Sequence, residues 1–486
     1  GTGAVRRLLV HAHFHQPPRE DPFSGEIPPD RDAAPFRDWN ARIAAECYRP
    51  LAELDVYRRI SFDVGGPLAG WLGTHDPTTA RAMAAGVGAI AIPYHHAILP
   101  LASPADARTE VRWGLRAFEA RFGRRARAAW LPEAAVDLAS LRLLADEGVE
   151  ATILAPWQVE APGIDLRRPV RIDLGDGRAI VVVRYDERLS VSLSFDPNAS
   201  VDADRFVRER VLPRLTGADG WVVPAAGSGS GSGDHPQPSD DEAGLVVIAT
   251  DGELYGHHQP FRDRFLARLV AADGPADGLF AAGLAEALDD LPGLHPTGHL
   301  NERTSWSCHH GVARWGWECP DAPDGRWKAP LRAAFDRLAA GVDAIVDERF
   351  RAAGLDLAEL RDGWIEVVEG LEAVEPWLER RLAAGAAGAA RDERVTVAAA
   401  ASLMDAVRWR LAMYASDAWF WDDPVRTETR GALRRAARAA RLVDAATGSR
   451  LEAALRDDLA AVVSPASGLD GRALYRMALA EVGQPA

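Results

Sequence analysis

The chain is poor in cysteine, in positive charge and in long apolar runs, and each shortage excludes a class of protein. Three cysteines, Cys47, Cys308 and Cys319, among 486 residues are too few for a disulfide framework, so we expect a reducing, cytoplasmic environment. A formal net charge of −15 argues against nucleic acid or an anionic membrane as a partner. No window holds 18 consecutive uncharged apolar residues, so we expect no transmembrane helix. The composition does not indicate an oligomeric state.

Cofactor signatures are also missing. Neither GxGxxG, GxxxxGK[ST] nor GxSxG occurs where a strand would turn into a helix, so dinucleotide, nucleotide and serine-hydrolase chemistry have no support. We expect no cofactor. Histidine is likewise absent beyond His310, where the chain becomes rich in Ala, Leu and Arg. This shift marks two regions with different roles.

The first 300 residues alternate short apolar runs with amphipathic segments, a pattern typical of a parallel sheet with helical crossovers. Polar or aromatic residues stand where the runs end; these are His13, His15, Asp63, His96, Glu133, Trp157, Asp186 and Asp251. Because a closed barrel brings all strand ends to one rim, residues 1–300 are predicted to form a (β/α)7 TIM-like barrel. Residues 88–93 are expected to be one of its strands, and residues 170–174 and 179–183 a hairpin.

Two further regions follow the predicted barrel. Residues 301–330 form an aromatic and Cys/His-rich connecting segment, and helical periodicity over 331–486 predicts an α-helical C-terminal domain packed on the barrel. Within the barrel, residues 227–241 (GSGSGSGDHPQPSDD) read as a flexible insertion. The arginine-rich run 430–441 reads as a solvated helix face.

Two carboxylates are placed to carry chemistry. Glu133 ends the run Ala128–Pro132, and Asp251 follows the apolar run 245–249. Retaining glycosyl transfer uses a nucleophilic carboxylate and an acid/base carboxyl roughly 5–5.5 Å apart, which two strand ends on one rim can provide. Either residue alone could equally be a salt-bridged or solvated loop carboxylate.

Several motifs, in the same order, resemble those of glycoside hydrolase family 57. They are His13-Phe14-His15-Gln16-Pro17, Tyr94-His95-His96-Ala97-Ile98-Leu99, Trp130-Leu131-Pro132-Glu133 and Asp251-Gly252-Glu253-Leu254-Tyr255-Gly256. Thr304-Ser305-Trp306-Ser307-Cys308, and Met413-Tyr414 with Trp419-Phe420, are similar to a subgroup with a helical C-terminal domain of unassigned function. His15 departs from that subgroup, which often has tyrosine there.

The resemblance implies a retaining enzyme acting on an α-glucan or maltooligosaccharide, with Glu133 as nucleophile and Asp251 as acid/base. Hydrolysis of the α-amylase type is the first expectation; a 4-α-glucanotransferase or 1,4-α-glucan branching enzyme on the same site is the alternative. Substrate contacts are expected from His13, His15, Gln16, His96, Trp130, Trp157, Asp186, Glu253, Trp306 and Trp419.

Other interpretations remain open at this point. The histidines at strand ends could hold a metal, as in a metal-dependent polysaccharide deacetylase, although we expect none; a non-catalytic glucan-binding protein is a further alternative. Cys308, His309, His310 and Cys319 lack a CxxC pair, which favours a packing role over a zinc site. The aromatic residues around Trp419 are expected to pack helices against the barrel, or to line the glucan groove.

Overall fold

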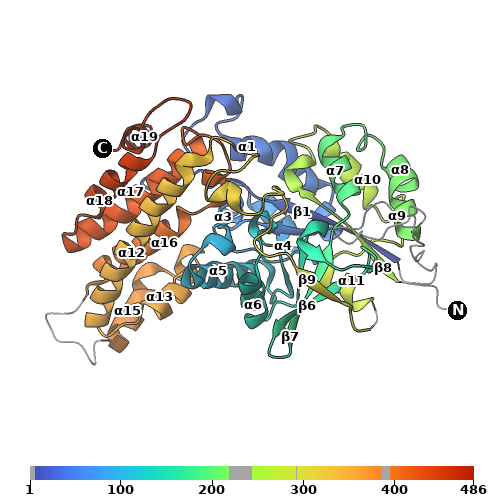
Figure 1. Ribbon diagram of the computed structural model, residues 1–486, viewed down its shortest axis with the longest axis horizontal. Helices are drawn as coiled ribbons and strands as arrows, with labels where there is room; N and C mark the ends of the chain where they lie inside the picture. Colours follow the sequence, from blue (N-terminus) through green and yellow to red (C-terminus); the bar gives the residue numbers. More distant parts are fainter. Residues whose placement is uncertain (1–5, 218–242, 292, 386–394, 486) are drawn as a thin grey trace. The chain divides into compact units, whose positions relative to one another are not determined.

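A computed structural model describes residues 6–217, 243–291, 293–385 and 395–485 (Figure 1). The predicted insertion 227–241 lies outside the described residues. The chain divides into two compact units. The barrel unit comprises Gly1–Gln16, Asp30–Pro93 and Phe118–His309, and the helical unit comprises Pro17–Pro29, Tyr94–Ala117 and His310–Ala486. Residues 94–117, which we had placed in the 1–300 barrel domain, therefore group with the helical unit.

The barrel unit is built on a ring of parallel strands. These are β1 (Arg6–Phe14), β2 (Ser61–Val64), β3 (Ala128–Ala129), β4 (Ala151–Leu154), β7 (Arg178–Arg184) and β8 (Gly244–Asp251). Strand β1 lies between β2 and β8, while β4 lies between β3 and β7, all in parallel register. Single parallel bridges at Ala89 and Ala91 join β2 to β3.

The ring closes between β7 and β8, where the backbone N–H of Asp186 donates to the carbonyl of Val247 at 2.7 Å. The predicted (β/α)7 barrel is confirmed. Its third member is shorter than the expected strand 88–93, because only Ala89 and Ala91 make bridges. A Cβ on Gly88 would lie 1.8 Å from the carbonyl oxygen of Ala282, so the chain passes too closely here for a side chain.

Outside the ring, β6 (Val170–Gly175) pairs with β7 as the predicted hairpin. Two short strands, β9 (Thr297–Leu300) and β5 (Val159–Glu160), extend this side of the sheet. The helices of this unit are α1 (Trp39–Ile43), α2 (Arg49–Glu53), α3 (Gly66–His75), α4 (Pro77–Ala84), α6 (Leu138–Asp146), α7 (Glu187–Phe195), α8 (Ala203–Phe206), α9 (Leu212–Thr216), α10 (Arg262–Leu269) and α11 (Leu284–Asp289). Helix α6 starts at Leu138, because the Asp137 carboxylate accepts the Ser140 N–H at its N-terminus.

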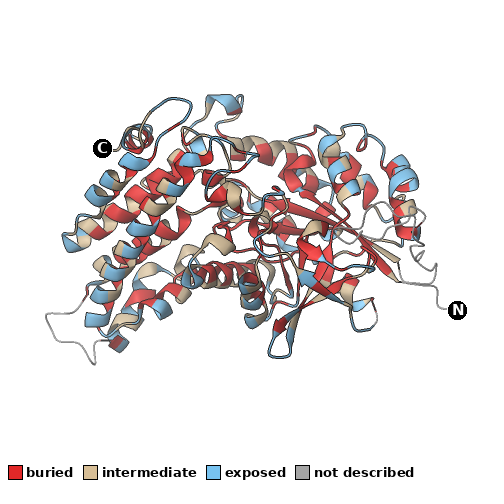
Figure 2. Ribbon diagram, viewed as in Figure 1, coloured by how far each residue is buried: buried red, intermediate tan, exposed pale blue. Residues whose placement is uncertain are grey.

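The core of the barrel unit explains the apolar runs of the sequence. Residues 8–10 of β1 and 245–249 of β8 are buried, because parallel strands are covered on both faces; Figure 2 shows the central strands of this unit in red. His11 and His13 interrupt this pattern on one face of β1, since alternate residues of a strand point the same way. Both are buried, so each requires polar partners.

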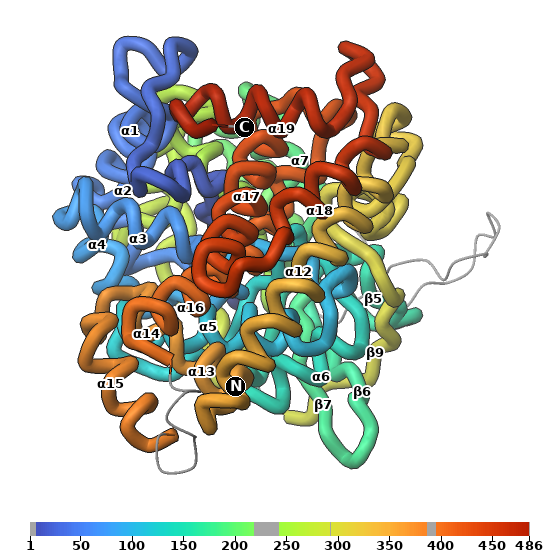
Figure 3. Tube along the Cα trace, turned by 90° about the vertical axis from the view of Figure 1, so that its left-hand side faces the viewer, coloured from blue at the N-terminus to red at the C-terminus, as the bar shows by residue number. Residues whose placement is uncertain are grey.

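The helical unit contains the long helices, several of which run side by side in Figure 3. They are α12 (Lys328–Ala352), α13 (Leu357–Gly363), α14 (Ile365–Val368), α15 (Val374–Gly385), α16 (Val397–Ala412), α17 (Thr427–Thr447), α18 (Leu451–Asp458) and α19 (Gly471–Ala480), with most of α5 (Pro104–Phe122). Helices make up most of the described part of 331–486, as the helical periodicity of the sequence predicted. Among the described helices, none combines the length and the apolar character that a membrane span requires.

The arginines of α17 correct one expectation. Arg434 and Arg435 are buried, so the run 430–441 is not simply a solvated face. The Arg435 guanidinium donates to the carbonyls of Ala412 and Pro18, both within the helical unit. The long side chain thus reaches backbone acceptors that sequence periodicity does not reveal.

Candidate active site

Two histidines and an aspartate form the floor of the candidate site, at the C-terminal ends of β1 and β2. The parallel register sets His11 beside Ser61 and His13 beside Asp63. Asp63 accepts from both rings, at 3.0 Å from His11 Nε2 and 2.7 Å from His13 Nδ1. One fully buried carboxylate therefore orients both histidines.

The two rings differ in charge. Burial lowers the pKa of His11 despite the Asp63 carboxylate, so His11 is neutral and its Nδ1 lies 2.9 Å from the Ser61 hydroxyl. For His13, burial is the largest effect and is unfavourable to the cation, yet the charge and hydrogen bond of Asp63, with smaller contributions from Asp251 and Glu253, raise its pKa to about 9. The site thus holds one buried imidazolium near neutral pH.

Two acidic residues, Asp251 and Glu253, lie at the end of β8, on the side of β1 opposite β2. Asp251 pairs in register with His13 and is exposed, whereas Glu253 is buried and accepts from the Tyr48 hydroxyl at 2.6 Å. Burial raises the pKa of Glu253 to about 7, with a further rise from the Asp251 charge and an opposing effect from the Tyr48 hydrogen bond. A Cβ on Gly252 would approach the Phe14 ring to 2.3 Å, so glycine is needed between the two acids.

Glu133 stands on a strained turn just beyond β3. Its backbone is left-handed (φ 57°), as is that of Ala134 (φ 47°), which costs on the order of 1 kcal/mol per residue. Its Oε2 accepts from Trp306 Nε1 at 3.2 Å and from the Ser307 hydroxyl at 2.8 Å. Two neutral donors on one oxygen stabilise the ionised form of this carboxylate.

Trp306 joins the two halves of the site. Its ring lies edge-on to His13, with centroids 6.2 Å apart, and edge-on to Trp130 at 4.8 Å. Its N–H holds Glu133, and His13 is the register neighbour of Asp251. Both predicted catalytic carboxylates therefore belong to the same rim of the barrel.

Other predicted residues surround this rim. The half-buried Trp157 donates from Nε1 to the carbonyl of Ser305 at 2.9 Å, and its ring contacts Tyr185. His15 stacks on His13 at 5.9 Å, and its carbonyl accepts from Gln16 Nε2. Trp130, predicted as a substrate contact, is a correction: it is fully buried beneath His11 and His13, so it supports the histidines from behind and presents no face to a sugar.

Two of the predicted substrate contacts, Asp186 and Trp419, are enclosed by other groups, and a third, His96, lies in the helical unit. Asp186 is a correction: it caps α7 through the N–H of Leu189 and pairs with the buried Arg214 at 2.6 Å, so both its oxygens are occupied. His96 belongs to the helical unit, where its Nδ1 lies 2.6 Å from the Ser416 hydroxyl.

Trp419, also in the helical unit, is a correction as well. It is fully buried, stacked with Trp327 and edge-on to Phe335. Its ring is therefore enclosed by packing within the helical unit and presents no face to a sugar.

Three polar residues of the site were missed from the sequence. Tyr48 stands within the helical stretch that follows α1, and no local pattern links it to Glu253. Ser307 adjoins Trp306 in a motif we had quoted, so the motif could have indicated it. His258 lies within the field of Asp251, and burial lowers its pKa; its place after a glycine turn gave no signal.

Two family models match parts of the chain. Residues 87–272 match glycosyl hydrolase family 57, and residues 324–482 match a domain of unknown function, DUF3536. No curated protein sequence matches the chain significantly.

Solved structures with a similar fold extend over nearly the whole chain. An exo-type maltose-forming amylase from Pyrococcus sp. ST04 has a TM-score of 0.69 and 14% identity, over 97% of this chain and 88% of that one. A branching enzyme from Pyrococcus horikoshii gives 0.61 and 14%, over 98% and 94%. A 4-alpha-glucanotransferase from Thermococcus litoralis gives 0.55 and 14%, over 90% and 60%. At such identities the likeness shows the fold alone.

Proposed function

Because the chain carries a glycosyl hydrolase family 57 domain, we propose that it is a retaining glycoside hydrolase acting on α-glucans. Glu133 is the nucleophile and Asp251 the acid/base. The observation that carries this proposal is the position of Trp306, which donates to Glu133 and packs against His13, the strand neighbour of Asp251. The similar solved structures, each named for an enzyme that acts on α-glucans, support the substrate class.

In the first step, Glu133 attacks the anomeric carbon as the glycosidic C–O bond breaks, and Asp251 gives its proton to the leaving oxygen. The donors Trp306 and Ser307 suit Glu133 to this role, because they favour its ionised form. In the second step, Asp251 takes a proton from the acceptor hydroxyl, which attacks the glycosyl-Glu133 ester and restores both carboxyls. The anomeric configuration is thereby retained.

Of the two acids at the end of β8, Asp251 fits the proton-transfer role better. It is exposed at the rim, whereas Glu253 is buried and held by the Tyr48 hydroxyl and the N–H of His15. Glu253 acts on its neighbour by charge. When Glu253 is ionised, its negative charge helps to hold the neighbouring His13 as an imidazolium.

The acceptor decides between hydrolysis and transfer. Water as acceptor makes the enzyme an α-amylase-type hydrolase, our first proposal; a sugar hydroxyl makes it a 4-α-glucanotransferase or a branching enzyme. Incubation with maltoheptaose separates these: only shorter sugars mean hydrolysis, and a ladder of both longer and shorter linear sugars means 4-α-transfer. New branch points in amylose mean branching activity.

A separate experiment tests the assignment of Glu133 as nucleophile and Asp251 as acid/base. It compares substrates whose leaving groups differ in their need for a proton. Glu133→Gln should lose about 1,000-fold or more in rate on every substrate, because the nucleophile is needed whatever leaves. Asp251→Asn should lose a similar factor on maltoheptaose but far less on a glucosyl fluoride, whose leaving group needs no proton.

The exposed carboxylates Glu160 and Asp277 offer matched controls, and Glu160→Gln and Asp277→Asn should leave all rates unchanged. Near wild-type turnover of maltoheptaose by Glu133→Gln or Asp251→Asn would remove the assignment. If the wild-type chain binds maltoheptaose and leaves it intact, the protein is a glucan-binding protein without this activity.

A further inference from the structure

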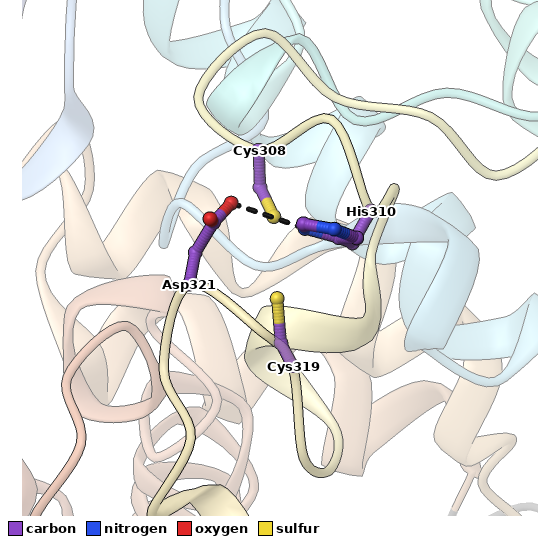
Figure 4. Close-up of side chains that lie close together, drawn as sticks. All are labelled: Cys308, His310, Cys319 and Asp321. Carbon is purple, nitrogen blue, oxygen red and sulfur yellow. Dashed lines mark hydrogen bonds and ion pairs between the residues drawn. The ribbon is translucent and has the colours of Figure 1, made fainter.

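Four metal-ligating side chains meet on one loop outside the candidate catalytic groups. The Sγ atoms of Cys308 and Cys319, a ring nitrogen of His310 and a carboxylate oxygen of Asp321 all lie within 4.8 Å of one another. Figure 4 shows the four side chains pointing toward a common centre. We propose that they form a zinc site.

The geometry suits a tetrahedral ion. His310 Nδ1 lies 3.1 Å from Asp321 Oδ2, and two ligands each about 2.0 Å from a tetrahedral zinc are separated by about 3.3 Å. Two thiolates at about 2.3 Å from zinc would be about 3.8 Å apart, within the observed limit. Small rotations of the side chains therefore bring all four to bonding distance.

The types of ligand atom favour zinc over the other common divalent ions. Two thiolates, one imidazole and one carboxylate are ligands for a borderline-soft ion such as Zn²⁺, whereas Mg²⁺ and Ca²⁺ prefer oxygen alone. The two cysteines are buried, at 2% exposure each, while the side chains of His310 and Asp321 are 42% and 44% exposed. The protein thus seals one side of the site, and the ion enters from solvent. Four protein ligands complete the coordination, which is typical of a structural zinc.

The site belongs to one continuous segment. His310, Cys319 and Asp321 lie in the helical unit, and Cys308 precedes His310 by two residues on the same loop. The ligands come as two hooks, Cys308-His309-His310 and Cys319-Pro320-Asp321. The second hook is set by a tight turn in which the carbonyl of Cys319 accepts the N–H of Ala322 at 2.8 Å. A search for CxxC pairs misses this arrangement, because each cysteine is matched with a non-cysteine ligand two positions later.

The first hook adjoins the residues that hold Glu133. Cys308 directly follows Trp306 and Ser307, both donors to the Glu133 carboxylate, and its carbonyl accepts from the Ser305 hydroxyl at 3.1 Å. A zinc ion at Cys308 would therefore limit the motion of this loop. Its role is structural, and it takes no part in the chemical steps.

The test measures metal directly, on the full chain purified under reducing conditions and supplied with Zn²⁺ before removal of excess ion. We expect about one zinc per chain by elemental analysis. His310→Ala and Asp321→Asn should lose most of it, and because both residues are exposed, the fold should survive, as circular dichroism can check. His299→Ala and Asp324→Asn change exposed residues of the same types and should retain the zinc.

The visible absorption spectrum of the Co²⁺-substituted protein identifies the ligands. Co²⁺ in this site should give the intense visible bands of a tetrahedral ion and a thiolate charge-transfer band that Cys319→Ser weakens and Cys47→Ser leaves unchanged. Failure to bind zinc, unchanged zinc in the His310 and Asp321 variants, or a Cys308–Cys319 disulfide in the reduced preparation would each overturn the proposal. None of these outcomes bears on Glu133 and Asp251, whose test is turnover of maltoheptaose.

Discussion

Replacing Trp306 with phenylalanine should raise the pKa of the Glu133 carboxyl and shift the acidic limb of the activity profile to higher pH. The substitution keeps an aromatic ring against its ring partners Trp130, His13 and Tyr185. It removes the indole N–H, one of the two donors to Glu133 Oε2. The ionised form of Glu133 loses more stabilisation than the neutral form, so the pKa must rise.

The size of the shift follows from the hydrogen bond. A bond from a neutral donor to a charged acceptor contributes about 1.5–3 kcal/mol, and the 3.2 Å separation places this one at the lower end. Since one pKa unit corresponds to 1.36 kcal/mol, about 1.5 kcal/mol gives a rise of about one unit. Ser307→Ala should give a smaller shift, because Ser307 is exposed and water can replace its hydroxyl.

The assay is kcat/KM for maltoheptaose across the acidic range, since this quantity reports the ionisation of the free enzyme. Trp409→Phe is the matched control: its Nε1 also donates to a carboxylate at 3.2 Å, that of Asp405 in the helical unit. Its profile should match wild type. If the acidic limb of Trp306→Phe does not move while activity persists, either Glu133 is not the ionising group or its bond to Trp306 is not formed in solution.

The remaining predictions concern a glycine, a buried ion pair and a buried histidine. Gly252→Ala should lower kcat at least about 10-fold and lower the thermal midpoint, because its Cβ would meet the Phe14 ring at 2.3 Å; a wild-type kcat would refute this packing. Arg410→Leu removes one of the two arginine partners of the half-buried Asp106 and Asp343 and leaves them Arg361; it should destabilise by about 1.5–3 kcal/mol in urea unfolding, and a loss below about 0.5 kcal/mol would contradict it. The raised pKa of His13, about 9 against 6.5 in the unfolded chain, means that its charged pairing with Asp63 stabilises the fold fully below pH 6.5 and is lost as pH rises to about 9. Thermal midpoints over this range should fall more steeply for wild type than for His13→Asn.

The electrostatics of the site rest on Asp63, a residue we had noted only as one of several strand ends. Its carboxylate serves two histidines whose rings stand on the same face of β1, yet they carry different charges. His11 is enclosed, with Ser61 as its other partner, whereas His13 also faces the acids at the end of β8. A difference of two positions along one strand thus separates a neutral from a charged imidazole.

What the sequence determined by itself is the order and type of the elements and the positions of the polar strand ends. Alternating apolar runs predicted the (β/α)7 barrel, because a strand covered on both faces has to be apolar throughout. Helical periodicity over 331–486 likewise predicted the helical character of the C-terminal region. Both catalytic candidates, Glu133 and Asp251, were evident for the same reason: each places a carboxylate directly after a buried run.

Only the tertiary structure decided which polar groups meet. Asp186 and Glu133 both follow strands, but α9 brings Arg214 to the first, whereas a loop from residues 304–307 brings two neutral donors to the second. Trp419 and Trp306 both stand in aromatic motifs, yet the first is enclosed by helices and the second remains half-exposed at the rim. The periodicity of apolar residues indicates which residues are buried, because each buried position must itself be apolar. A partner that lies a hundred residues away depends on the path by which the chain returns, and no local pattern contains that path.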